Sequence, residues 1–128
     1  MKRVTGLGGI FFKAGNPESL VGWYRDHLGL EPEPHGPYVN FNWREVDDPS
    51  RTGTTVWSAF AKDTEYFGPK NGDFMFNFRV EDMDAVLQAL AAEGVEIDPK
   101  RDDTPYGRFA WITDPEGNRV ELWEPPKE

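Results

Sequence analysis

The sequence predicts an α+β fold in which one architecture occurs twice. Each half opens with an apolar strand, continues with an amphipathic helix that ends at a glycine, and goes on to further strands. The two helix-ending glycines are Gly29 and Gly94, and each leads into an extended segment. The boundary between the halves is expected within 67–72, "FGPKNG".

The first half begins with the apolar run 7–13, which predicts a strand. Asn16 is a good helix N-cap, and Pro17 suits the first helical position. The helix that follows carries a stripe of mostly apolar residues at helical spacing: Leu20, Trp23, Tyr24, His27 and Leu28. After the three prolines of "EPEPHGP", the runs 38–44 and 54–61 are rich in aromatic and β-branched residues and predict a β-hairpin.

The second half begins with "GDFMFNFRV", which predicts another strand. Its two faces carry Phe74, Phe76 and Phe78 on one side, and Met75, Asn77 and Arg79 on the other. We expect the phenylalanines to pack under the helices, because aromatic side chains are more often core than ligand-binding residues. Asp82 then caps a helix that runs to about Glu93. The carboxylates at this helix start, Glu81, Asp82 and Asp84, are interpreted as capping and helix-dipole residues rather than metal ligands.

The C-terminal segment "DPEGNRVELWEP" (114–125) predicts a tight turn followed by a strand. Alternation along that strand places Arg119, Glu121 and Trp123 on one face. Glu121 could line a pocket, bind a metal or face solvent.

Length, charge and composition restrict the classes of function. A chain of 128 residues suits one domain, and its net charge of −9 argues against nucleic acid and anionic membranes as partners. The absence of cysteine removes disulfides, thiolate ligands and a cysteine nucleophile. No apolar run is long enough to span a bilayer, and the N-terminal residues do not have the pattern of a signal peptide, so we expect a cytoplasmic protein.

Three segments in this order resemble the vicinal oxygen chelate superfamily, which includes glyoxalase I, bleomycin-resistance proteins and extradiol dioxygenases. They are "GNPESLVGWYRDHLGL", "FRVEDMDAVLQALAAEGVEI" and "DPEGNRVELWEP". The resemblance implies one domain of two tandem βαβββ modules, about 1–68 and 69–128. It also implies a curved, cup-shaped mixed sheet and a homodimer.

The resemblance also implies where a metal would bind. Enzymes of that superfamily hold a metal with one His, Glu or Gln from the first and last strand of each module. On this chain those positions fall at Gly9, Trp57, Met75 and Glu121. Only Glu121 is a suitable ligand, since glycine, indole and thioether groups do not bind hard or borderline cations well. The two histidines, His27 and His35, lie outside the family's ligand positions.

We therefore expect a metal-independent protein that binds a small, partly aromatic or apolar molecule in the cup, without a cofactor. The predicted binding residues are Phe11, Trp57, Met75, Asn77, Arg79, Arg108, Glu121 and Trp123, with Tyr106 or Phe109 as a further wall. One alternative is a glyoxalase-like lyase, isomerase or dioxygenase in which Glu121 acts as a base or in an unusual Zn, Ni, Mn or Fe centre. Another is a non-catalytic interaction subunit.

Overall fold

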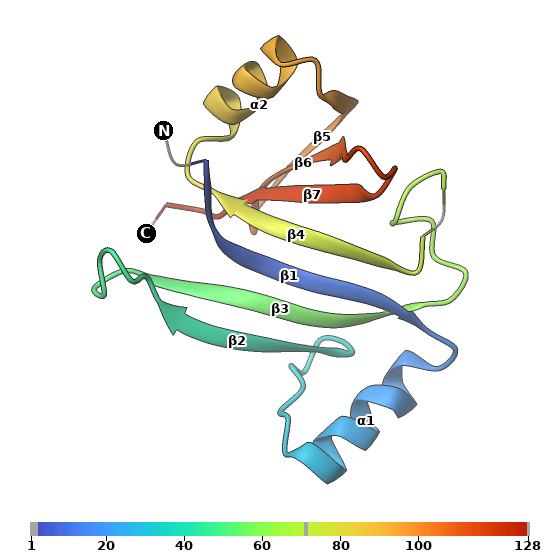
Figure 1. Ribbon diagram of the computed structural model, residues 1–128. Helices are drawn as coiled ribbons and strands as arrows, with labels where there is room; N and C mark the ends of the chain where they lie inside the picture. The colour runs from blue at the N-terminus through green and yellow to red at the C-terminus, as the bar shows by residue number, and fades with distance from the viewer. Residues whose placement is uncertain (1–2, 71, 128) are drawn as a thin grey trace. The chain divides into compact units, whose positions relative to one another are not determined.

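The computed structural model describes residues 3–70 and 72–127 and has an α+β fold with seven strands and two helices (Figure 1). Residue 71, in the predicted boundary segment, lies outside the described residues, as do residues 1, 2 and 128. The chain divides into two compact units, which we call unit A (residues 9–74) and unit B (residues 3–8 and 75–127). Strand β1 (Val4–Ala14) contributes to both. The α+β class is confirmed, whereas the chain boundary between two modules stays a prediction.

Unit A contains the second half of β1 and three further elements: α1 (Pro17–Leu28), β2 (Tyr38–Arg44) and β3 (Thr52–Ala61). Strand β3 is central, parallel to β1 and antiparallel to β2, so the predicted hairpin is confirmed. Four strands were expected in this half, but residues 29–37 form none. The three prolines in this segment explain the difference, because proline has no N–H group to donate to a neighbouring strand.

The capping of α1 follows the sequence prediction, but its buried face does not. The N-cap Asn16 accepts a hydrogen bond from the Ser19 amide at 3.0 Å, and Gly29 ends the helix with φ of 72°. The face that packs on the strands centres on Val21, which lies against Ala14 and Ala59. The helix approaches the strands closely where these three small residues meet. The predicted stripe is therefore wrong for Trp23 and Leu28, which are 51% and 64% exposed.

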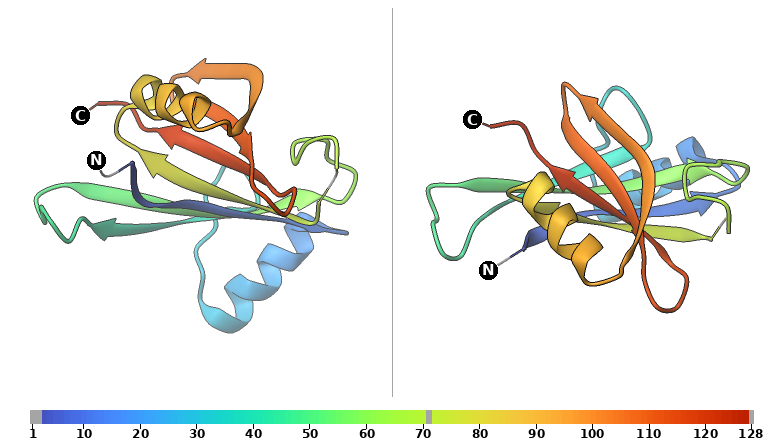
Figure 2. Two further views of the ribbon diagram at one scale, coloured as in Figure 1. Left: turned by 45° about the horizontal axis from the view of Figure 1, so that its top comes forward. Right: turned by 90° about the horizontal axis from the view of Figure 1, so that it is seen from above.

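Unit B has four further strands, the first of which begins one residue inside unit A, and one helix. In chain order they are β4 (Phe74–Val80), α2 (Met83–Ala92), β5 (Glu96–Thr104), β6 (Gly107–Thr113) and β7 (Arg119–Glu124). The strand order is β4-β7-β6-β5, with β4 parallel to β7 and the other pairs antiparallel, and the first half of β1 lies beside β4. Helix α2 covers one face of these strands (Figure 2).

The core of unit B lies between α2 and the strands. Its buried members are Val80, Met83, Val86, Ala110, Val120 and Leu122. Phe78 packs against this cluster, as predicted, but Phe74 and Phe76 are 46% and 41% exposed. The prediction that all three phenylalanines pack under a helix is therefore wrong for two of them, because α2 packs only on the C-terminal end of β4.

The start of α2 confirms Asp82 as a cap and changes the interpretation of Asp84. The Asp82 side chain accepts a hydrogen bond from the Ala85 amide at 3.1 Å. Asp84 pairs instead with Arg108 and Arg101 on the neighbouring strands, each at 3.2 Å. These partners, the Arg108 hydrogen bond foremost, lower the pKa of Asp84. Neither helix of the described chain is long and apolar enough to cross a membrane.

The Asn16 cap gives a direct test of how α1 is held. We expect Asn16→Ala to lower the free energy of unfolding by about 1 kcal/mol, because the Ser19 amide loses its acceptor. Asn16→Asp keeps an acceptor at the positive end of the helix and should retain most of the stability. Urea unfolding of the three proteins measures the difference. Equal losses for both variants would contradict the capping role.

Candidate functional site

The candidate site is the face of unit B opposite α2. Pairing of three adjacent strands, β4, β7 and β6, places the side chains of this face in rows. The polar row is Asn77, Glu121 and Trp111, and the aromatic row is Arg79, Trp123 and Phe109. Within each row the β7 residue is the direct cross-strand partner of the other two. Neighbouring strands lie about 4.8 Å apart, so the side chains in a row are within contact distance.

The side chains of the polar row are joined by hydrogen bonds. The Asn77 Nδ2 atom donates to Glu121 Oε1 at 2.6 Å, and the Trp111 indole Nε1 donates to Glu121 Oε2 at 3.0 Å. All three side chains are only 1% exposed. A buried carboxylate without partners costs several kcal/mol, so these two donors are what make Glu121 tolerable in the interior.

Glycines in β1 make room for neighbouring side chains. A Cβ atom on Gly8 would collide with Asn77 Oδ1, and one on Gly9 would lie 2.6 Å from the Phe11 ring. Gly8 and Gly9 therefore serve close packing. Asn77 Oδ1 itself is buried and has no hydrogen-bond partner among the described residues. Gly8 therefore allows the Asn77 amide to lie in the orientation that donates to Glu121.

The aromatic row is stacked and partly exposed. The Trp123 and Phe109 rings are nearly parallel, at 5°, with centroids 6.0 Å apart. The Arg79 guanidinium carbon lies 5.1 Å from the centre of the Trp123 ring, and the Trp123 indole donates to the Tyr106 carbonyl at 2.8 Å. Each ring is therefore fixed in orientation, and part of each side chain is accessible.

The turn before β7 sets the register that brings these residues together. The Asp114 carboxylate accepts from the Asn118 amide at 2.8 Å and the Glu116 amide at 2.9 Å, and Gly117 has φ of 83°. The Asn118 side chain, 3.0 Å from the other oxygen, is the main cause of the lowered pKa of Asp114, with the backbone amides adding to it. The predicted turn is confirmed, and it aligns Glu121 with Trp111.

Two predicted binding residues face the helices instead. Trp57 packs against Tyr24 of α1 and Phe12 of β1, each with ring centroids 4.9 Å apart. The prediction that Trp57 occupies the position equivalent to Glu121 is therefore wrong. Side chains alternate between the two faces of a strand, so an alignment error of one residue along β3 places the side chain on the wrong face. Arg108 points to the α2 side and pairs with Asp84 at 3.2 Å.

The remaining predicted residues divide between the two units. Met75, Asn77 and Arg79 share the face of Glu121, but the direct partner of Glu121 on β4 is Asn77 rather than Met75. Phe11 is buried in unit A, where its ring contacts Phe60. Binding of a ligand by these residues stays a prediction.

Trp111 is the residue that sequence reasoning missed. The signal was present, because β6 and β7 flank a short turn and hairpin pairing follows from the turn. Counting outward from Thr113 and Arg119 gives Trp111 opposite Glu121.

These residues do not supply the set of ligands that a divalent metal needs. Both oxygens of Glu121 already accept from neutral N–H donors, the indole N–H cannot ligate a cation, and the one further oxygen, Asn77 Oδ1, lies against Gly8. Within residues 3–70 and 72–127, no group of three or more His, Asp or Glu side chains is arranged to hold a metal. The His27 ring contacts that of Trp23 at the surface of α1, tilted by 37°, and His35 is exposed in the segment after it.

Comparison with protein-family models matches residues 7–122 to the glyoxalase/bleomycin resistance protein/dioxygenase superfamily. The chain belongs to this superfamily. No curated protein matches it.

Solved structures share the fold at low sequence identity. Methylmalonyl-CoA epimerase from Mycobacterium tuberculosis is 20% identical with a TM-score of 0.64, over 99% of this chain and 92% of that one. A Streptomyces coelicolor methylmalonyl-CoA epimerase variant in complex with 2-nitronate-propionyl-CoA is 14% identical with a TM-score of 0.66, over 97% and 99%. A superfamily member from Vibrio splendidus 12B01 is 15% identical with a TM-score of 0.57, over 93% and 99%.

A double-mutant cycle tests the polar row. We expect Trp111→Phe and Glu121→Gln each to lower the free energy of unfolding by about 1–3 kcal/mol, because each leaves a buried polar group without its partner. The double variant should lose less than the sum, with a coupling of at least about 0.5 kcal/mol.

Trp43→Phe is the matched control, since it removes an indole hydrogen bond to Thr55 elsewhere in the chain. Combined with Glu121→Gln, this control should be additive. Additivity for Trp111→Phe as well would show that the Trp111–Glu121 bond has no energetic role.

Proposed function

We propose that this superfamily member binds a small, flat, partly aromatic molecule on the aromatic row, without a metal. The proposal depends on the hydrogen bonds of Glu121, whose two carboxylate oxygens accept from Asn77 and Trp111. The carboxylate at the family's ligand position therefore serves the structure of unit B. The accessible side chains beside it are those that suit ligand contact.

The aromatic row favours a planar ligand with an anionic group. Trp123 and Phe109 present ring surface at low entropic cost, because their orientation is already fixed by stacking and by the indole hydrogen bond to Tyr106. Arg79 places a positive charge beside the Trp123 ring. A guanidinium in this position attracts a carboxylate or phosphate on a ligand that stacks there.

Glu121 is poorly placed to act as a general base. A base must come within hydrogen-bonding distance of the proton that it removes. Glu121 is 1% exposed, and its oxygens accept bonds from two fixed neighbours. The lyase, isomerase and dioxygenase alternatives all require this carboxylate to be released from the polar row.

Metal analysis separates binding from metal-dependent catalysis. Protein purified without chelators should contain far less than one equivalent of Zn, Ni, Mn or Fe. Thermal shifts with Zn²⁺, Ni²⁺ and Mn²⁺ should be the same for the wild type and Glu121→Gln, because the carboxylate offers no free oxygen. Stoichiometric metal, or a large stabilisation that depends on Glu121, would favour the metalloenzyme instead.

Ligand binding can be tested with 2-naphthoate and its neutral analogue 2-naphthylmethanol, followed by NMR of the indole N–H signals. We expect both to shift the Trp123 signal, and Trp123→Leu to weaken both by about tenfold, roughly the 1.4 kcal/mol of one stacking contact. Arg79→Gln should weaken only the naphthoate.

Trp23→Leu is the matched control, since Trp23 is an exposed tryptophan on α1. It should leave both affinities unchanged. An equal loss with Trp23→Leu, or no shift of the Trp123 signal, would contradict the proposed site.

A further inference from the structure

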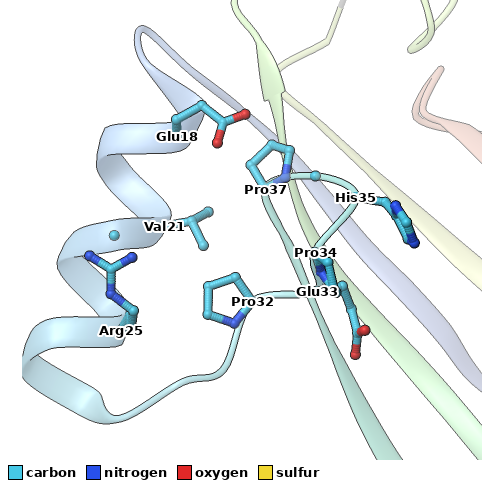
Figure 3. A pocket seen from close by; sticks show the side chains of 10 residues that line it. Glu18, Val21, Arg25, Pro32, Glu33, Pro34, His35 and Pro37 are labelled. Atoms are coloured by element: carbon cyan, nitrogen blue, oxygen red, sulfur yellow. The ribbon is translucent and has the colours of Figure 1, made fainter.

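Unit A contains a cavity of about 290 Å³ between α1 and the proline-rich segment that follows it (Figure 3). It is separate from the polar and aromatic rows, whose residues belong to unit B. The helix contributes Glu18, Val21, Gly22 and Arg25 to its lining, and the segment contributes residues 32–37. Figure 3 shows Pro32 and Pro37 turned toward the helix with Val21 between them, while the side chains of Glu33 and His35 point away.

The wall formed by residues 32–37 is fixed by backbone hydrogen bonds. The Glu33 amide donates to the Tyr38 carbonyl at 2.9 Å, and the Ala59 amide of β3 donates to the Pro37 carbonyl at 3.1 Å. Three of the six wall residues are prolines, which have no N–H group to offer a ligand. The apolar contacts in the cavity come from Val21, Pro32 and Pro37, whose side chains face one another, and the rest of its lining is largely polar.

Gly22 keeps the cavity open on the helix side. A glycine inside a helix lowers stability by about 0.5–1 kcal/mol relative to alanine. Its presence in α1 is therefore consistent with a need for space at this position. A Cβ atom on Gly22 would meet nothing closer than Arg25 Nη2, at 3.4 Å. A larger side chain at this position would extend into the space in front of the prolines.

Two oppositely charged side chains lie at the two ends of the cavity. Glu18 and Arg25 are seven residues apart on α1, which corresponds to about 10 Å along the helix axis. Figure 3 shows Glu18 at the Pro37 end and Arg25 at the Pro32 end. Arg25 donates through Nε to Asp26 at 3.0 Å, which leaves its two Nη groups without a hydrogen bond among the described residues. Glu18 likewise has no ion-pair or hydrogen-bond partner among them.

We propose that this cavity binds a small zwitterion whose ammonium and carboxylate groups are separated by a saturated chain. The ammonium group pairs with Glu18, the carboxylate pairs with Arg25, and the chain contacts Val21 and the prolines. The length of the saturated chain follows from the two charged residues, which lie about 10 Å apart along the helix axis. Because both charged ends are exposed, each ion pair is weak and binding is expected near millimolar.

The test uses 6-aminohexanoate as the probe, with hexanoate and hexylamine as singly charged analogues. Titrations are followed through the backbone amide signals of Val21, Gly22 and Gly36 on the full chain. We expect saturable shifts with 6-aminohexanoate and at least fivefold weaker binding of each analogue. An analogue that binds as well as the zwitterion, or the absence of saturable shifts, would overturn the proposal.

Variants locate the binding and test the charges. Gly22→Leu should abolish binding while far-UV circular dichroism shows the helix retained, since leucine is a strong helix former. Glu18→Gln and Arg25→Gln should each weaken 6-aminohexanoate about fivefold. Glu31→Gln, which changes an exposed carboxylate outside the lining, should have no effect.

Exchanging the two charges separates a loss of binding from a loss of folded protein, because the double variant is expected to bind again. Glu18→Arg and Arg25→Glu should each abolish binding alone. The double variant should recover binding, with the zwitterion bound in the opposite orientation. Failure of the double variant to recover binding, or unchanged binding by Gly22→Leu, would refute the zwitterion site. Neither outcome bears on the aromatic row, whose ligand tests use variants in unit B.

Discussion

The structure of unit B depends on one buried carboxylate and its two donors. Glu121 accepts from Asn77 on β4 and from Trp111 on β6, so a single side chain connects three adjacent strands. A slip of β7 by one residue would turn Glu121 toward α2, where the apolar cluster offers it no hydrogen-bond donor. The cost of an unpaired buried carboxylate therefore specifies the strand register, in addition to whatever stability the bonds contribute.

This constraint also divides the face opposite α2 into a closed part and an accessible part. The polar row is buried and its carboxylate is occupied, whereas Arg79, Trp123 and Phe109 in the next row remain partly exposed. The two neutral donors of the polar row hold both oxygens of Glu121, so this carboxylate belongs to the closed part. Glu121 thus serves packing specificity, and the ligand surface that we propose is the neighbouring row.

The two halves share their helix caps and glycine stops but have diverged in detail. Prolines replace a strand after α1, and the segment they form becomes the wall of a cavity opposite Gly22. On β3, Trp57 turns toward its helix, whereas Glu121 on β7 turns away from its own.

The sequence by itself determined the local features: the caps at Asn16 and Asp82, the turn after Asp114, and the strand face on which Glu121 lies. Each depends on a few adjacent residues whose hydrogen bonds or dihedral preferences act over one turn. Only the tertiary structure decided that Asn77 and Trp111, rather than Met75 and Trp57, accompany Glu121, and that α1 buries Val21 instead of Trp23. Strand register and helix rotation follow from packing between segments far apart in the chain, and no local pattern records that packing.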